Sequence, residues 1–181
     1  MHNIITQEKI KFGQIDLATL CAFHRVLLTT DGTLTDMLAS YLLEHIQLIK
    51  LSERIISLQN DISALCVKAG EEIIERKILL RGEVSGKNYV FADSVVVIGR
   101  LDQKFQNELK TTQTPMGRLW LEHKMETFKE MIDIGKEPAN ELASYFCIEP
   151  EDILLSRTYR VFSKSRPVIM ITEKFPVDNV L

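Results

Sequence analysis

Residues 72–80 read Glu72-Ile73-Ile74-Glu75-Arg76-Lys77-Ile78-Leu79-Leu80, and this stretch decides the fold. Side chains of a β-strand point alternately to its two faces, so one face of the segment carries Ile74, Arg76, Ile78 and Leu80. The pattern predicts a strand that packs an apolar face into the protein, with one full charge on that face. An unpaired buried charge costs several kcal/mol, so we expect Arg76 to have a partner.

The C-terminal part of the chain repeats this pattern with charges of both signs. Residues 168–175 read Val168-Ile169-Met170-Ile171-Thr172-Glu173-Lys174-Phe175, which places Glu173 on the face of Ile169, Ile171 and Phe175. In the segment 153–162, alternation places Arg157 on the face of Ile153, Leu155, Tyr159 and Val161. The partner of each inward charge is another of the three, a neighbouring residue or a ligand.

Two interpretations of the inward charges stay open. An arginine fork and a carboxylate in an apolar pocket suit a small anionic molecule that carries a hydroxyl, which favours a ligand role for Arg76 and Glu173. A buried structural Arg–Glu pair explains the same pattern, and a one-residue bulge would reverse the faces.

The order of the predicted elements favours an α+β fold. Hairpins are expected from residues 71–81 with 88–98, joined by the glycine-containing loop 82–87, and from 153–162 with 167–175, joined by the polar loop 163–166. Further strands are predicted over 46–58 and 125–134, and helices over 16–28, 33–45, 101–109, 118–123 and 138–146. We predict an antiparallel β-sheet with helices packed against it, in a single domain over residues 1–181.

Composition narrows the classes of partner. The chain has 181 residues, 45% hydrophobic and 26% charged, with a formal net charge of −3. This balance is typical of a globular domain and argues against nucleic acid as the main partner, because phosphate binding needs a strongly basic face. No apolar run has the length of a membrane span, and the N-terminal residues lack a signal-peptide pattern. We therefore expect a cytoplasmic protein that does not bind membranes; its oligomeric state stays open.

The cysteines predict neither a disulfide framework nor a thiolate metal site. Cys21, Cys66 and Cys147 are odd in number, widely separated and without Cys-x-x-Cys spacing. Cys21 and Cys147 lie in apolar stretches predicted to be helical, so we expect them to be buried structural thiols.

Three segments together resemble the chorismate pyruvate-lyase family. They are Arg76-Lys77-Ile78-Leu79-Leu80, Thr114-Pro115-Met116-Gly117-Arg118 and Ile171-Thr172-Glu173-Lys174-Phe175-Pro176, in the order and at the spacing of the family. The family reads Arg-Glu-Ile-Leu-Leu, Thr-Pro-Leu-Gly-Arg and Thr-Glu-Leu-Phe in these places. Residues 31–35 also fit the turn that precedes an early helix of the family.

The resemblance implies an antiparallel sheet with packed helices and a buried ligand cavity. It also implies conversion of chorismate to 4-hydroxybenzoate and pyruvate without metal or organic cofactor. Arg76 matches the arginine that grips the ring carboxylate, and Glu173 matches the glutamate that meets the ring hydroxyl. Leu34 and Met116 match positions that contact the ligand through backbone. The expected partner is a small aromatic or cyclohexadienyl carboxylate.

One segment departs from the family pattern. Where the family reads Gly-Arg-Thr on the second hairpin strand, this chain reads Ala92-Asp93-Ser94, so Asp93 replaces a basic residue. A second cation would help to hold the enolpyruvyl carboxylate of chorismate, and Arg157 is the candidate for that substrate-binding role.

A second resemblance gives the alternative function. Residues 140–143 and 148–150, the run Arg157-Thr158-Tyr159-Arg160 and Pro167 are similar to the effector-sensing domain of GntR-type transcription regulators. That domain shares the lyase fold and binds small ligands without turnover. The alternative to a lyase is therefore a non-catalytic domain that binds a small carboxylate with the same Arg76 and Glu173.

Overall fold

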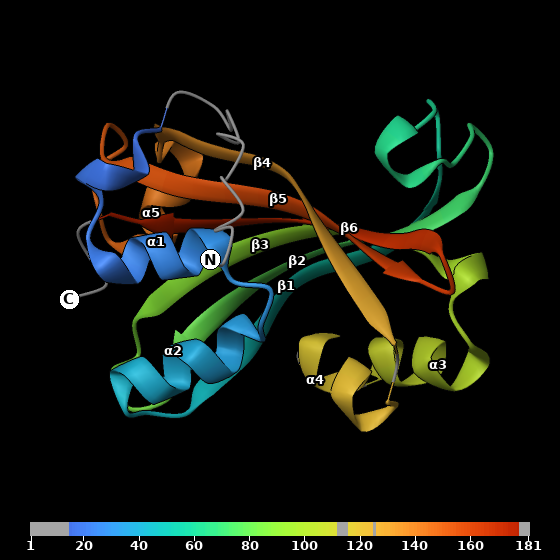
Figure 1. Ribbon diagram of the computed structural model, residues 1–181, viewed down its shortest axis with the longest axis horizontal. Coiled ribbons are helices and arrows are strands. Elements are labelled where there is room, and N and C mark those ends of the chain that lie inside the picture. Colours follow the sequence, from blue (N-terminus) through green and yellow to red (C-terminus); the bar gives the residue numbers. More distant parts are fainter. Residues whose placement is uncertain (1–14, 112–115, 125, 178–181) are drawn as a thin grey trace, which may run out of the picture.

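The computed structural model describes residues 15–111, 116–124 and 126–177, which are built around one six-stranded antiparallel sheet (Figure 1). The strand order is β1-β2-β3-β6-β5-β4, and every neighbouring pair is antiparallel. The strands are β1 (Ile46–Ser57), β2 (Glu72–Gly82), β3 (Asn88–Val97), β4 (Thr127–Pro138), β5 (Ile153–Ser163) and β6 (Arg166–Pro176). The α+β fold with both predicted hairpins is confirmed.

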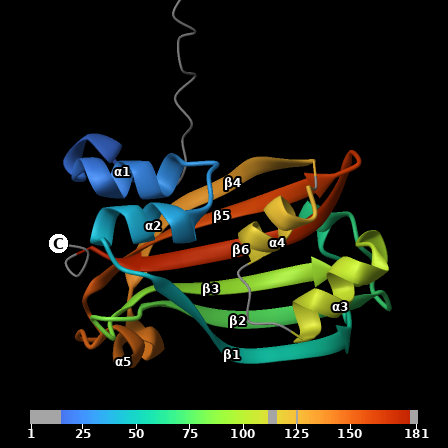
Figure 2. The same ribbon diagram turned by 90° about the horizontal axis from the view of Figure 1, so that it is seen from below.

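Helices cover both ends of one face of this sheet (Figure 2). Two helices, α1 (Ala22–Thr29) and α2 (Leu34–Leu42), lie over one end, and α3 (Gln103–Thr111) and α4 (Met116–Glu122) lie over the other. Short elements complete the described fold: α5 (Ala143–Phe146) and the 3-10 turns η1 (Leu17–Thr19), η2 (Ser63–Leu65), η3 (Ile98–Arg100) and η4 (Asn140–Leu142).

Two apolar clusters pack under these helices on the same face. One joins the sheet to α1 and α2 through residues such as Leu27, Leu34 and Leu80. The other joins it to α3 and α4 through residues such as Phe105 and Trp120. Ile78 and Met131 contact both clusters, so the two cores meet in the middle of the sheet. The opposite face is closed separately, by α5 near Leu79 and by η2 near Ile73.

The N-terminal helix is shorter than the sequence pattern predicts. Residues 16–28 do not form one helix: Asp16 caps the turn η1 by accepting from the Ala18 N–H at 2.9 Å, and Leu20 is extended. Helix α1 then begins after Cys21, its N-cap, whose Sγ accepts from the backbone N–H of His24 at 3.5 Å. Local capping therefore wins over the apolar periodicity that runs through both segments.

The prediction that Cys21 and Cys147 are buried is wrong, because both thiols are exposed. Cys21 caps the start of α1, and Cys147 ends α5 in the left-handed conformation with φ 55°. Residues at helix ends are half outside the helix, so the apolar stretch around a cap does not determine its burial.

Strand β4 also extends past its predicted end at Gly135 and reaches Pro138. A Cβ at Gly135 would lie 3.0 Å from Ser156 Oγ on β5, so this glycine permits a close cross-strand approach instead of ending the strand. β4 is an edge strand, so alternate backbone N–H groups point away from the sheet and pair with no neighbouring strand. Pro138, which has no N–H, is therefore tolerated in it. None of the described helices is long and apolar enough to cross a membrane.

Candidate functional site

The three charges that alternation places inward are all buried. Arg76 is 2% exposed, Glu173 6% and Arg157 1%. The strand-face prediction is therefore confirmed for β2, β5 and β6, and no bulge reverses these faces. The three residues lie on the helix-covered face of the sheet, where the two apolar clusters meet.

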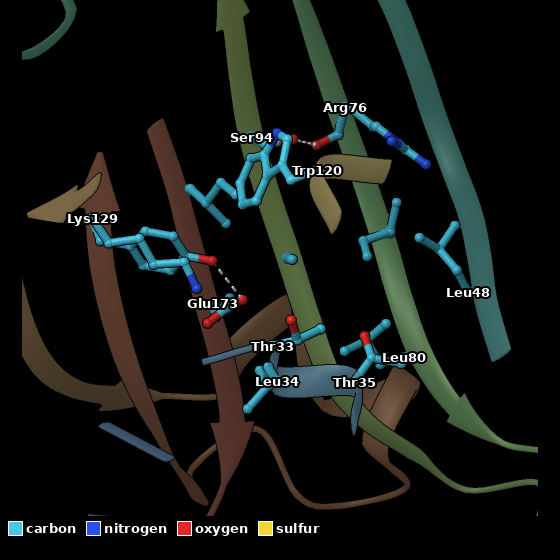
Figure 3. A pocket seen from close by; sticks show the side chains of 14 residues that line it. Thr33, Leu34, Thr35, Leu48, Arg76, Leu80, Ser94, Trp120, Lys129 and Glu173 are labelled. Atoms are coloured by element: carbon cyan, nitrogen blue, oxygen red, sulfur yellow. Dashed lines mark hydrogen bonds between the residues drawn. The ribbon is translucent and has the colours of Figure 1, made fainter. Parts of the chain in front are cut away.

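A cavity occupies that part of the face (Figure 3). Its floor is the sheet, from Leu48 on β1 to Lys129 on β4, and its walls come from the start of α2 and from Trp120 on α4. The lining residues are Thr33, Leu34, Thr35, Leu48, Arg76, Ile78, Leu80, Ala92, Ser94, Trp120, Lys129, Tyr159, Ile171 and Glu173. A cavity is therefore present where the family resemblance implies one, and Arg76, Glu173 and Leu34 line it; that it binds a ligand stays a prediction.

Arg76 brings a buried cation to this cavity. Its Nε lies 3.5 Å from Glu53 Oε2, and within the described chain none of its three guanidinium nitrogens has a hydrogen-bond acceptor. Burial holds the pKa of Arg76 below its ordinary value, and the charge of Glu53 partly opposes that shift. Five N–H donors in a planar fork match a carboxylate, so the arrangement suits an anionic ligand.

Trp120, which also lines the cavity, carries a second buried donor without a partner in the described chain. Its indole Nε1 is buried and has no hydrogen-bond partner among residues 15–111, 116–124 and 126–177. Leaving a buried donor unsatisfied costs about 1–3 kcal/mol, which a ligand oxygen would recover. In the view of Figure 3, Trp120 and Arg76 are drawn toward one end of the cavity, and Glu173 and Lys129 toward the other.

Glu173 is held by two hydrogen bonds at the opposite side. The Arg157 Nε donates to Oε2 at 2.5 Å, and the Tyr159 hydroxyl donates to Oε1 at 3.0 Å. Burial and the negative charge of Glu173 raise the pKa of Tyr159 well above its ordinary value. Tyr159 thus stays protonated and donating, and the carboxylate of Glu173 is fixed in position with lone pairs left for a ligand hydroxyl.

Arg157 lies behind Glu173 and is not among the residues that line the cavity. Its Nη1 donates to the carbonyls of Leu27 at 2.5 Å and Thr30 at 2.9 Å, at the C-terminal end of α1. A cation is favourable at this end of a helix. The substrate-binding role expected for Arg157 stays a prediction; the contacts that it makes position Glu173 and the segment before α2.

The start of α2 faces the cavity, as the resemblance implies for Leu34. Thr33 is the N-cap but makes no side-chain capping hydrogen bond, and Leu34 is buried. The first N–H groups of a helix have no partner within it and favour negative charge. Met116 opens α4, but its side chain lies outside the described residues, as do Thr114 and Pro115, so its expected contact stays a prediction.

Asp93 points away from the cavity. Its neighbours Ala92 and Ser94 line the cavity, whereas Asp93 stands opposite Lys77 on the other face, with 3.8 Å between Oδ2 and Nζ. Burial raises the pKa of Asp93, against the opposing effect of Lys77. In this chain, the replacement of a basic residue at position 93 therefore changes the outer face of the sheet and puts no acid into the cavity.

Sequence reasoning missed Lys129, the second cation that lines the cavity. Its Nζ donates to the carbonyl of Gly32 at 2.9 Å and lies 5.4 Å from the centroid of the Tyr159 ring. Burial lowers the pKa of Lys129, which the charge of Glu173 partly offsets. One signal was available: β4 alternates Lys129 with Met131, and Met131 packs in both cores. Within the described residues, no group of three or more His, Cys, Asp or Glu residues is placed to hold a metal ion.

The fold and the cavity define a class of α+β domain in which a cavity that contains the cations Arg76 and Lys129 lies between an antiparallel sheet and its covering helices. Residues 28–180 match the family model described as Chorismate pyruvate-lyase Rv2949c-like. The chain belongs to this family.

Curated relatives agree with the family. The chorismate pyruvate-lyase of Mycobacterium leprae is 34% identical over 160 residues, which cover 83% of this chain and 72% of the relative. That of Mycobacterium tuberculosis is 28% identical over 157 residues, covering 83% and 78% of the two chains.

This chain shares its fold with solved structures of ligand-binding and effector domains of transcription regulators. The effector domain of PhnF from Mycobacterium smegmatis matches with a TM-score of 0.64 at 10% identity, covering 83% of this chain and 92% of that one. The ligand-binding domain of a GntR-family regulator from Bordetella bronchiseptica matches with a TM-score of 0.57 at 18% identity, covering 75% and 85%. At such identities these likenesses show the fold alone.

Proposed function

We propose that the protein is a chorismate pyruvate-lyase that eliminates pyruvate from chorismate and releases 4-hydroxybenzoate. The observation that carries this proposal is the buried guanidinium of Arg76, which faces the cavity with no hydrogen-bond acceptor in the described chain. Glu173 lies across the cavity from it (Figure 3) and accepts a hydrogen bond from Tyr159. Such a cavity has a donor end and an acceptor end.

The two ends match the two polar ends of the product. In 4-hydroxybenzoate, and in the ring of chorismate, the carboxylate and the C4 hydroxyl lie at opposite corners. Arg76 and the Trp120 N–H bind the ring carboxylate, and Glu173 accepts a hydrogen bond from the C4 hydroxyl. Leu48, Ile78, Leu80 and Ile171 supply the apolar surface against the ring faces.

The reaction needs orientation more than it needs reactive groups. The ether bond from C3 to the enolpyruvyl oxygen breaks, the C4–H is lost as a proton, and the ring becomes aromatic. The enolpyruvate that leaves takes up a proton at its methylene carbon and becomes pyruvate. Aromatisation drives the step, so the cavity contributes chiefly by holding the side chain in a reactive conformer and excluding water.

A binding domain without turnover is the second candidate, because the effector domains of regulators share this fold. Both candidates use Arg76 and Glu173, so binding of 4-hydroxybenzoate does not separate them. Formation of product from chorismate does.

The test is incubation of the purified protein with chorismate, followed by chromatography of 4-hydroxybenzoate and pyruvate. We expect both products in equal amounts from the wild type. In Arg76→Met we expect a loss of about 30-fold or more in kcat/KM, because truncating one member of a buried charge contact costs about 2–5 kcal/mol. Arg54→Met is the matched control, since Arg54 is an exposed arginine paired with Glu75 on the outer part of the sheet. Binding of 4-hydroxybenzoate by a folded wild type that makes no product would support the second candidate.

A further inference from the structure

We propose that Lys129 binds the second carboxylate of the substrate, so that the cavity prefers a dicarboxylate to the monocarboxylate that it releases. This inference rests on the ligand orientation given under the proposed function. It concerns a residue that neither the inward-charge pattern nor the family motifs single out.

Lys129 has donor capacity that the described protein does not use. An ammonium carries three N–H donors. Within the described residues, the Lys129 Nζ donates to the carbonyl of Gly32, and Lys129 forms no ion pair with a described carboxylate. Glu173 and Asp31 are the acids that attract it, and Glu173 is already bonded to Arg157 and Tyr159. The cavity therefore offers a partly buried cation without a matched anion.

The position of Lys129 fits the chemistry of a C3 substituent. Figure 3 shows Lys129 beside Glu173, with Arg76 on the far side of the cavity. If the C4 hydroxyl meets Glu173, the side chain on the neighbouring C3 lies at the same end, beside Lys129. The carboxylate of an enolpyruvyl ether then comes within reach of the ammonium, which also stabilises the negative charge that develops as enolpyruvate leaves.

The contact with Gly32 gives the competing explanation. Gly32 lies directly before the N-cap of α2, so in this explanation Lys129 merely holds the start of α2, a wall of the cavity, in place. Such a structural role would support the binding of every ligand of the cavity alike. A group that binds the second carboxylate would support dianions alone, and this difference decides the experiment.

The experiment compares two stable ligands, 4-hydroxybenzoate and 3-(carboxymethoxy)-4-hydroxybenzoate. The second carries an added carboxylate on the carbon next to the hydroxyl. Trp120 is the chain's single tryptophan and lines the cavity, so its fluorescence reports binding. The variants are Lys129→Met and Lys129→Arg, with Lys136→Met as control, because Lys136 is an exposed lysine on the same strand.

We expect Lys129→Met to weaken the affinity for the dianion by about 10- to 100-fold, the range of a hydrogen bond to a charged group. The affinity for the monoanion should fall by less than about threefold. Lys129→Arg should retain the preference, and Lys136→Met should match the wild type. Equal weakening of both ligands, or an unchanged affinity for the dianion, would overturn the proposal. Because neither ligand is turned over, this test gives an answer even if chorismate is not converted; if it is converted, Lys129→Met should raise KM for chorismate.

Discussion

Arg157 and Glu173 stand directly opposite each other on β5 and β6, and the Arg157 Nε lies 2.5 Å from Glu173 Oε2. Both side chains are buried, so each neutralises a charge that would otherwise be costly. The two members of the pair have different roles. Glu173 faces the cavity with a fixed geometry, whereas Arg157 fixes it and caps the end of α1.

This pairing predicts a large stability effect for Glu173→Gln. The substitution leaves the Arg157 cation buried without its counter-charge, which costs about 3–5 kcal/mol when one partner of a buried pair is removed. The free energy of unfolding from urea denaturation measures it. Glu75→Gln is the control, because Glu75 pairs with Arg54 at the surface and should change stability by less than about 1 kcal/mol. Similar losses in the two variants would contradict the role given to the pair.

Arg76→Met should act in the opposite direction on stability. Arg76 is a buried cation whose nearest described acid is Glu53, and Glu53 keeps Lys50 as a partner at 3.0 Å after the substitution. We expect the free energy of unfolding to stay constant or rise by about 1 kcal/mol while ligand binding is lost, as for a residue retained for function. Parallel urea denaturation and 4-hydroxybenzoate titration check both halves. A loss of several kcal/mol would show that Arg76 is structural.

The lowered pKa of Lys129 predicts how the preference for the dianion depends on pH. Burial and the Arg157 cation lower this pKa, and Glu173 and Asp31 raise it. The ratio of dianion to monoanion affinity should be constant near neutral pH and fall as pH rises through a pKa below the ordinary lysine value of about 10.4. Both ligands carry a phenol, so the effect of its titration on affinity cancels in this ratio. In Lys129→Arg the ratio should stay constant over the same range; an equal fall there would assign the titration to another group.

Asp93→Asn should stabilise the protein at neutral pH. The folded-state pKa of Asp93 is raised, so its contribution to stability is fully present below the unfolded pKa and is lost as pH rises through the folded pKa. Removing the charge avoids that loss. The gain should stay below about 1 kcal/mol because the side chain is partly exposed and paired with Lys77. Thermal unfolding of both proteins from pH 3 to 7, about the range of carboxyl titration, should show the difference growing with pH; a stabilised wild type at neutral pH would contradict it.

Alternation in the sequence was enough to predict which charges point inward. Arg76, Arg157 and Glu173 lie on strands with clear period-two apolar faces, and all three are buried as expected. The partner of each charge was not predictable, because it depends on register between strands. The pairing of Arg157 with Glu173 shows that these two neutralise each other, whereas Arg76 has only the contact with Glu53 and no hydrogen-bond acceptor in the described chain.

Lys129 and the cysteines show two further reasons for missed features. The apolar face of β4 is interrupted by a register shift between Met131 and Asp133, so its alternation does not read clearly through the strand. Cys21 and Cys147 lie at helix caps, and the local hydrogen bonds that set those caps do not show in the apolar pattern. Irregular backbone, in a bulge or at a helix end, accounts for both cases.

A crystal structure of the wild-type protein with 4-hydroxybenzoate tests the central claim most directly. We predict the ligand in the cavity between β2, β6 and α2, with its carboxylate accepting from the guanidinium of Arg76 and its hydroxyl donating to Glu173. A ligand bound in the reverse orientation, or bound outside this cavity with Arg76 still without an acceptor, would contradict the site and the function proposed for it.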